Sequence, residues 1–194
     1  MRVKTTATCP MCCANMDFDW EVTDIPHFGE AMLISGVCSC GFRHTDTMLL
    51  GQSEPKRHTL EVESLEDLNA RVIRSSSGTI RVPEMGVAVE PGYASESYVS
   101  NVEGVLVKIR DVVQFATRSA RQACDQERTS RGEDILAHLA EAMEGRYPFT
   151  FILEDPLGNS AVVSERVAVE PLSQEEIDGL KTGMVILNLE DEQP

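Results

Sequence analysis

Four cysteines in two tight pairs constrain this chain more than any other feature. The first pair lies in Cys9-Pro10-Met11-Cys12 and the second in Cys38-Ser39-Cys40, with 25 residues between the pairs. Each pair can turn tightly and aim two thiolates at one ion, and a strand-sized spacer can bring the turns together. The pattern predicts one tetrahedral Zn²⁺ site with Cys9, Cys12, Cys38 and Cys40 as ligands.

The second pair has one residue between its cysteines, where zinc-binding turns usually have two. Either this turn tightens, or another side chain replaces one ligand, and the candidates are Cys13 and His44. A site of four thiolates keeps no coordination position open for water. The expected zinc is therefore structural, which argues against a zinc hydrolase.

Two other roles for paired cysteines stay open on the residues alone. A redox pair of the thioredoxin type should open a helix after a buried strand, but no apolar helical stripe follows Cys12. A disulfide framework belongs to oxidising compartments, and the sequence shows no apolar signal-peptide core. We therefore expect a cytoplasmic protein with reduced thiols, and we expect Cys124 to be a small buried hydrophobic residue.

The charge balance limits the partners of the chain. Its 194 residues include 17 basic and 32 acidic ones, for a net charge of −15. A surface this acidic repels phosphate backbones, so nucleic-acid binding by most of it is unfavourable. The locally basic stretches, residues 56–58 and 118–131, are interpreted as solvated faces. No apolar run is long enough to span a membrane.

The pattern of apolar residues predicts two parts. Residues 1–50 form a zinc ribbon, with strands at 18–22 and 31–37 and a turn at 24–29. About fifty residues are too few for a stable core without the metal. Residues 51–194 form a mainly β domain, whose expected strands are 59–63, 70–74, 78–82, 86–90, 148–154, 160–163 and 166–170. Residues 184–189 are expected to be a last strand or a tail.

A helical hairpin is predicted as an insertion into the β domain at about residues 101–145. Ser100 and Glu103 fit a capping box, and the apolar helical stripe behind it includes Val112. Ser130 and Glu133 fit a second capping box. The polar segment 125–129 would join the two helices, and Gly145 would end the second. Another Ser/Glu pair at 173–176 starts a short helix. His58 and His138 are interpreted as surface or ordinary helix residues.

Several segments in this order and spacing together resemble the ZPR-type zinc-finger family, in its archaeal form with a single module. The similarity covers residues 7 to about 163 and rests on Cys9-Pro10-Met11-Cys12, 25–30, 40–43, 81–86, 100–106 and 155–160. It implies a zinc ribbon similar to that of translation initiation factor 2 beta subunit. It also implies a double-stranded β-helix domain bearing a helical hairpin.

The resemblance also implies a partner. Eukaryotic relatives carry two such modules, bind translation elongation factor 1-alpha and act as a dedicated folding factor for it. Among the matching segments, Pro83, Glu84, Asp155, Gly158 and Asn159 are candidates for contact with the partner. The alternative for residues 155–160 is a tight β-turn, in which proline and glycine supply the backbone angles.

The sequence is compatible with three functions. The favoured one is a non-enzymatic zinc protein that binds translation elongation factor 1-alpha and assists its folding. The second is a nucleic-acid or transcription-associated zinc ribbon, and the third is a small-molecule enzyme that uses the β domain. For the third, the sequence carries no phosphate loop, no G-x-S-x-G elbow and no H-E-x-x-H motif.

Overall fold

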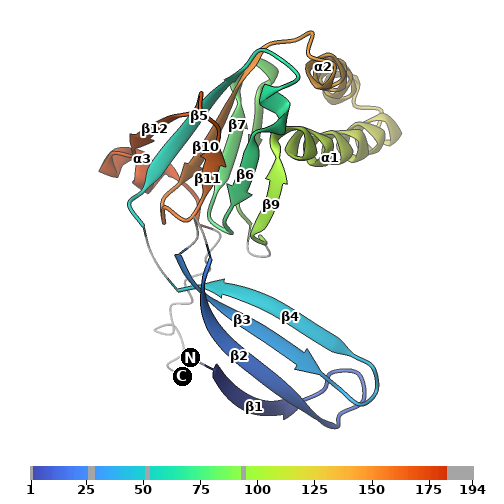
Figure 1. The fold of residues 1–194 in the computed structure, drawn as a ribbon. Coiled ribbons are helices and arrows are strands. Elements are labelled where there is room, and N and C mark those ends of the chain that lie inside the picture. Colours follow the sequence, from blue (N-terminus) through green and yellow to red (C-terminus); the bar gives the residue numbers. More distant parts are fainter. Residues whose placement is uncertain (1, 26–28, 51–52, 93–94, 183–194) are drawn as a thin grey trace, which may run out of the picture. The chain divides into compact units, whose positions relative to one another are not determined.

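A computed structural model describes residues 2–25, 29–50, 53–92 and 95–182 of the chain (Figure 1). The chain divides into two compact units, Met1–Ser53 and Glu54–Pro194. The segment 184–189, expected to be a strand or tail, lies outside the described residues. None of the described helices is both long and apolar enough to cross a membrane.

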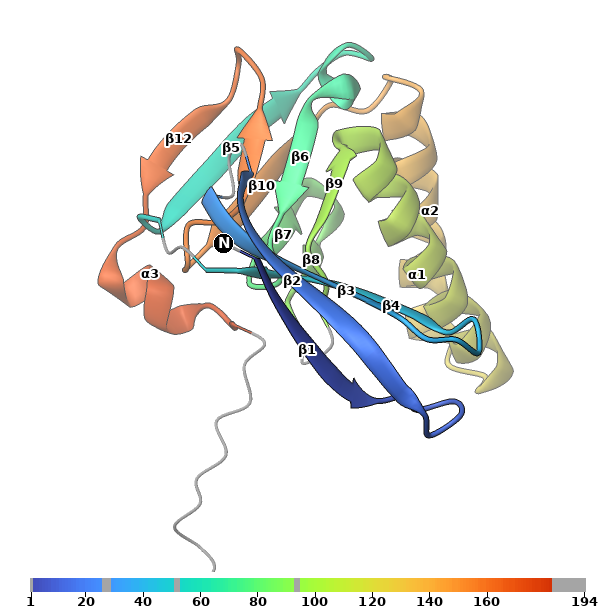
Figure 2. The ribbon, with the colours of Figure 1, turned by 60° about the horizontal axis from the view of Figure 1, so that its bottom comes forward.

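The first unit is a four-stranded antiparallel meander in the order β1-β2-β3-β4 (Figure 2). Its strands are β1 (Arg2–Thr8), β2 (Asn15–Ile25), β3 (Gly29–Val37) and β4 (Arg43–Leu49). The two strands predicted between the cysteine pairs are confirmed as β2 and β3. The outer strands were not predicted, because β1 is exposed along its whole length and so carries no apolar alternation.

The core of this unit is small and lies against the cysteine pairs. Met16 is fully buried beside Cys9 and Cys38, with Phe18 and Phe42 packed against them. Gly36 leaves room for this packing, since a Cβ atom there would lie 2.5 Å from the Met16 methyl carbon. The buried side chains among the described residues are too few to balance the entropy of ordering about fifty residues, which leaves a stabilising role for the metal.

The second unit contains two antiparallel sheets that enclose the main core. The five-stranded sheet has the order β12-β5-β10-β7-β8, and the three-stranded sheet has the order β11-β6-β9. This is the predicted double-stranded β-helix. The bounds are β5 (Lys56–Val62), β6 (Arg71–Arg74), β7 (Thr79–Val82), β8 (Val87–Val89), β9 (Tyr98–Asn101), β10 (Phe149–Asp155), β11 (Ala161–Val163) and β12 (Ala168–Pro171).

Apolar side chains from both sheets and both long helices fill the core. The largest fully buried ones are Phe151, Leu60, Ile80, Leu106, Leu139 and Leu153. On the five-stranded sheet, the buried Glu154 accepts hydrogen bonds from Arg57 (2.6 Å) and Arg81 (2.9 Å). Short connecting helices are η1 (Asp67–Asn69), η2 (Pro83–Met85) and α3 (Gln174–Gly179). The capping box of α3 at Ser173 is confirmed.

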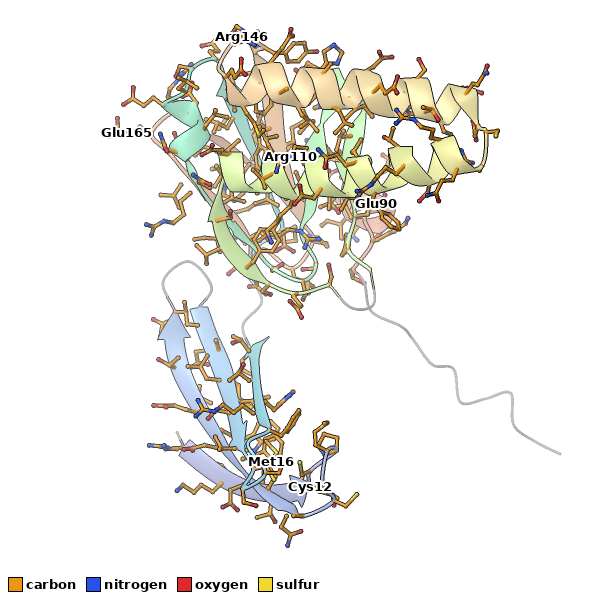
Figure 3. All side chains as sticks on the ribbon, turned by 90° about the vertical axis from the view of Figure 1, so that its right-hand side faces the viewer. Cys12, Met16, Glu90, Arg110, Arg146 and Glu165 are labelled. Atoms are coloured by element: carbon orange, nitrogen blue, oxygen red, sulfur yellow. The ribbon has the colours of Figure 1, made fainter. Side chains whose placement is uncertain are left out.

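The predicted helical hairpin is present as α1 (Val102–Gln122) and α2 (Gln126–Met143), which pack side by side (Figure 3). Gly145, in the left-handed conformation with φ +71°, follows the end of α2 as predicted. The predicted caps are wrong. Asn101 caps α1, because its side chain accepts the N–H of Gly104, and Asp125 caps α2 by accepting the N–H of Arg128.

The turn between the helices explains why the cap of α2 is Asp125 and not the predicted Ser130. Cys124 adopts a left-handed conformation, with φ 56°, and reverses the chain at once. Asp125 is as good a cap as serine, so α2 begins there and takes in the segment predicted as a linker. Cys124 is exposed in this turn, and the expectation that it is buried is wrong.

Two further residue assignments change with the fold. His58 is buried in β5, where its Nδ1 accepts the N–H of Val162 at 3.4 Å, and it is therefore not a surface residue. Arg57 beside it is half-buried and paired with Glu154, so residues 56–58 are not a solvated face. A basic stretch in a strand can face a neighbouring carboxylate as easily as water, and composition alone does not distinguish these cases.

Candidate metal centre

The first cysteine pair lies in the turn between β1 and β2. The Cys9 N–H donates to Ala14 O (2.8 Å), and the Cys13 N–H donates back to Cys9 O (2.9 Å). Cys13 completes the turn in the left-handed conformation, with φ 59°, a backbone angle that favours glycine. This turn holds Cys9 buried and Cys12 exposed at the end of the hairpin.

The second pair lies in the turn between β3 and β4, which is one residue tighter. The Cys38 N–H donates to Phe42 O (2.9 Å), and the Gly41 N–H donates to Cys38 O (3.0 Å). Gly41 supplies the left-handed angle, with φ 91°. The missing residue is thus absorbed by a shorter turn. In a meander, the β1–β2 and β3–β4 turns lie at the same end of the sheet, which brings the two pairs together.

The four sulfur atoms fit one tetrahedral ion. The Sγ atoms of Cys9, Cys12, Cys38 and Cys40 all lie within 4.8 Å of one another. The distance from Cys9 Sγ to Cys40 Sγ is 3.8 Å, and that from Cys12 Sγ to Cys38 Sγ is 3.5 Å. A zinc ion bonded to four sulfurs at about 2.3 Å would separate them by roughly 3.8 Å. Figure 3 shows Cys12 and Met16 at this end of the sheet.

Without an ion, the four thiols compete for protons. The N–H of Cys40 and the neighbouring thiols stabilise the Cys38 thiolate and lower its pKa to about 6, although burial opposes this. The Ala14 N–H lowers the pKa of Cys12, but its thiol hydrogen bonds with Cys38, Cys40 and Cys9, together with burial, raise it to about 12. A divalent cation removes this conflict by holding all four sulfurs as thiolates.

Neither candidate substitute ligand belongs to the four-sulfur cluster. Among the described residues, the group that can hold a metal contains only the four predicted cysteines. Cys13 is exposed, and its backbone serves the turn. The ring of His44 packs edge-on against Phe18, with 5.8 Å between centroids. The residues present therefore fit one structural zinc ion, and this ion would hold the two turns together.

Three predicted partner residues lie in a buried turn of the second unit. The Asp155 carboxylate accepts hydrogen bonds from the hydroxyls of Ser75 (2.7 Å), Ser77 (2.7 Å) and Ser160 (2.6 Å). Gly158 is buried with φ +69°, and Asn159 is 4% exposed. This bonding supports the β-turn interpretation, because it ties 155–160 to the turn after β6. A contact with a partner through these residues stays a prediction.

The other two predicted partner residues are more accessible. Pro83 and Glu84 are exposed on η2, which ends at Gly86 in the left-handed conformation. The Glu84 carboxylate accepts the hydroxyl of Thr150 at 2.6 Å. Burial would raise the pKa of Glu84, but its hydrogen bonds with Thr150 outweigh this effect and lower it. The role of both residues in partner binding also stays a prediction.

Sequence reasoning missed an exposed apolar surface on α1. Val112 is 68% exposed and Phe115 is 66% exposed, although the apolar stripe predicts that Val112 faces the core. The two lie beside a groove of about 610 Å³ along the hairpin, which Ala116, Ala120 and Ile135 also line. Phe115 lies off the stripe, and an aromatic residue on the polar face of an amphipathic helix was the available signal.

A four-thiolate ribbon joined in one chain to a jelly-roll β domain defines a zinc-finger protein with a structural metal centre. Family models for the ZPR1 zinc-finger domain and the ZPR1 jelly-roll domain match residues 3–54 and 66–178. The chain belongs to the ZPR1 zinc-finger family, as its sequence motifs predict.

Relatives from archaea and eukaryotes support this assignment. A ZPR1-like protein of Pyrococcus horikoshii is 42% identical over 171 residues, which cover 88% of this chain and 77% of that protein. One of Methanocaldococcus jannaschii is 41% identical over 93% of this chain and 91% of that protein. The zinc finger chaperone of Schizosaccharomyces pombe is 34% identical over 79% of this chain but only 34% of its own length.

Proposed function

We propose that this chain is a cytoplasmic zinc protein that binds translation elongation factor 1-alpha and assists its folding. The fission-yeast relative is named a zinc finger chaperone, and a chaperone acts by binding another protein. This name supports the proposal. Because the similarity covers about a third of that relative, one module of this chain would perform what a longer protein does there.

The observation that carries the proposal is the exposed apolar surface of α1. Val112 and Phe115 are both more than half exposed and lie three residues apart, so they share one face of the helix. Exposed patches of this kind on an otherwise acidic domain mark contacts with other proteins. Arg128 and Arg131 beside the groove add a polar, cationic rim.

The test is capture of the elongation factor from native lysate by the immobilised, zinc-loaded chain, followed by mass spectrometry. Phe115→Ser should reduce the recovered elongation factor at least about tenfold, because a central aromatic contact contributes about 2 kcal/mol or more. Val169→Asp, at a 49% exposed position on β12, is the matched control and should leave capture unchanged. If the wild-type chain recovers no elongation factor above background, the proposal fails.

The nucleic-acid alternative has less support from the ribbon. Residues 1–53 contain three basic residues, Arg2, Lys4 and Arg43, against six acidic ones. Arg2 pairs with Asp19, which removes part of even this small positive charge. Phosphate binding needs a cluster of free cations, and its affinity falls steeply with salt. Binding of RNA to the zinc-loaded chain at low salt would favour this alternative.

A further inference from the structure

A second apolar groove of the second unit lies between two sheet edges and α1. It has a volume of about 420 Å³, and its apolar lining includes Ile80, Val87, Val89, Tyr98, Ile109 and Val112. Val87 and Val89 belong to β8, Tyr98 begins β9, and the last two belong to α1. Glu90, which directly follows β8, lies beneath α1 in Figure 3.

Both strands along this groove are open on one side. Among the described strands, β8 pairs with β7 only and β9 pairs with β6 only, so each lies at the edge of its sheet. An open edge offers a row of main-chain donors and acceptors, and an extended segment can satisfy them by adding a strand. Val87 and Val89 pack against the core, whereas Ala88 between them is exposed. Alternate side chains of an added strand would therefore enter the groove.

The groove also holds a buried cation that has no carboxylate partner among the described residues. Arg74 of β6 is 4% exposed and lines the groove. Its Nε donates to Gly78 O (2.9 Å) and its Nη2 to Ser95 Oγ (3.2 Å), whereas Nη1 forms no hydrogen bond in the part of the chain that the structure describes. Burial lowers the pKa of Arg74, although Tyr98 and Asp155 oppose this. A buried charge is costly unless an opposite charge pairs with it.

A second cation lies near the same aromatic ring. Lys108 Nζ is 4.8 Å from the centroid of the Tyr98 ring, and Arg74 Cζ is 5.7 Å from it. Lys108 is exposed on α1 and forms no ion pair with a described residue. Glu90 is the carboxylate among the described residues that line the groove, and it pairs with Lys181 (2.5 Å). The groove is therefore locally positive, although the whole chain carries a net charge of −15.

We propose that this groove binds an extended segment of a partner protein that carries an aspartate or glutamate between apolar residues. The segment adds a strand to the open edge of β8. Its apolar side chains contact Val87, Val89 and Ile109, and its carboxylate pairs with Arg74 and Lys108. Such a segment complements the open main-chain groups, the apolar walls and the two cations. The assignment rests on these features and not on the proposed elongation-factor function.

Binding of two synthetic peptides to the full, zinc-loaded chain tests the proposal. The first is a fluorescein-labelled, amidated heptapeptide, Ser-Val-Ser-Glu-Ser-Val-Ser, which places the glutamate and both valines on one face of a strand. The second has glutamine in place of the glutamate. Fluorescence anisotropy should show saturable binding of the glutamate peptide and at least about tenfold weaker binding of the glutamine peptide, because charge-assisted hydrogen bonds are lost. Equal affinities, or no saturable binding of the glutamate peptide, would overturn the proposal.

Variants of the two cations identify the site. Lys108→Gln should weaken binding of the glutamate peptide about fivefold and that of the glutamine peptide less than about twofold, since the glutamine peptide has no charge to pair. Arg118→Gln removes an exposed cation of α1 outside the groove and is the matched control, which should leave both affinities unchanged. Equal effects of these two substitutions would overturn the proposal.

The buried cation has its own pair of variants. Arg74→Gln should weaken binding of the glutamate peptide at least about tenfold, and Arg74→Lys should recover part of this loss because it keeps the charge. Thermal unfolding shows whether each variant still folds, since Arg74 is buried. If neither variant folds, Lys108→Gln at its exposed position still decides the outcome.

Hydrogen exchange distinguishes this occupant from others. At saturation, the glutamate peptide should slow the exchange of those amides in residues 87–89 that point away from β7 at least about fivefold, because an added strand pairs them. Binding without this protection would put the peptide elsewhere. Protection before any peptide is added, together with a dimer in sedimentation, would assign the groove to a second copy. A glutamine peptide with a free C-terminal carboxylate that binds as tightly as the glutamate peptide would assign the cations to a chain end. Each of these three results would overturn the proposal.

Discussion

At the scale of single residues, four cysteines are positioned to bind one metal ion and a fifth has a role in the backbone of a turn. Cys9, Cys12, Cys38 and Cys40 bring four sulfurs within 4.8 Å of one another, whereas Cys13 serves the turn through its left-handed backbone. The sequence pattern was sufficient to predict which four thiols converge, because spacing determines which thiols a tight turn can aim at one ion. The sequence pattern could not exclude Cys13 as a ligand, since the role of Cys13 in the turn depends on its backbone angle φ.

This division predicts opposite effects of two substitutions. Cys40→Ser should reduce zinc content from one ion per chain to less than about a tenth, because the hydroxyl is a poor ligand and leaves three thiolates. Cys13→Gly should keep one zinc and raise the stability of the ribbon by about 1 kcal/mol, since it relieves the left-handed angle. Metal analysis and urea unfolding monitored at Trp20 measure both. Loss of zinc in Cys13→Gly would mean that Cys13 is a ligand.

His58 predicts a pH dependence of the second unit. Burial, together with Lys56, lowers the pKa of His58 below its ordinary value. The unfolded chain therefore takes up the proton first as pH falls below about 6.5, and stability declines until the folded-state pKa is passed. The slope for one proton is at most about 1.4 kcal/mol per pH unit. Urea unfolding followed by helical circular dichroism at pH 7.5 and pH 5.5 should show a smaller loss for His58→Asn than for wild type, whereas His44→Asn should match wild type.

At the scale of elements, the alternation of apolar residues predicted most strands, including the exposed β12, and missed β1, β4 and β9. β5, β7 and β10 were predicted within a few residues, whereas β1 is exposed throughout and gave no signal. The helical pair was predicted from its apolar stripes. The caps of the two helices were predicted wrongly, because Asn101 and Asp125 are as suitable as the nearby serines. Which residue caps the helix depends on where the chain reverses.

The contact between the two helices gives a test at this scale. A Cβ atom on Gly132 of α2 would lie 2.1 Å from the Thr117 Oγ1 of α1. Gly132→Ala should therefore destabilise the second unit by about 1–3 kcal/mol, despite the better helix propensity of alanine. In a Thr117→Ala background the same change should cost less than about 0.5 kcal/mol or stabilise the helix, because the clashing atoms are gone. Equal costs in both backgrounds would show that the helices do not meet there.

At the scale of the whole molecule, the two units depend on the metal to different degrees. Among the residues that the structure describes, buried apolar side chains are few in the first unit, whereas the second unit has a large core of its own. Removing zinc with a chelator should therefore unfold the ribbon alone. Trp20 fluorescence should shift, while the helical circular dichroism from α1 and α2 should change by less than about a tenth. Simultaneous loss of both signals would contradict independent units.

The family and its two-domain fold followed from motifs in the sequence, but the surface that carries the proposed function did not. Val112 belongs to an apolar stripe that predicts a buried face, and only the tertiary arrangement leaves it and Phe115 exposed. Periodicity reports which residues share a helix face, not whether another element covers that face. For the same reason, the sequence could not predict whether the turn at Asp155 is buried or lies in a surface loop.

The proposed function requires that this single module assist the folding of an elongation factor. The most direct measurement is cell-free synthesis of translation elongation factor 1-alpha with and without the purified, zinc-loaded chain, scored by the fraction of the product that binds GTP. We expect the wild-type chain and Val169→Asp to raise this fraction severalfold, and we expect Phe115→Ser and Cys40→Ser to leave it unchanged. An equal fraction with and without the wild-type chain would rule out the proposed function.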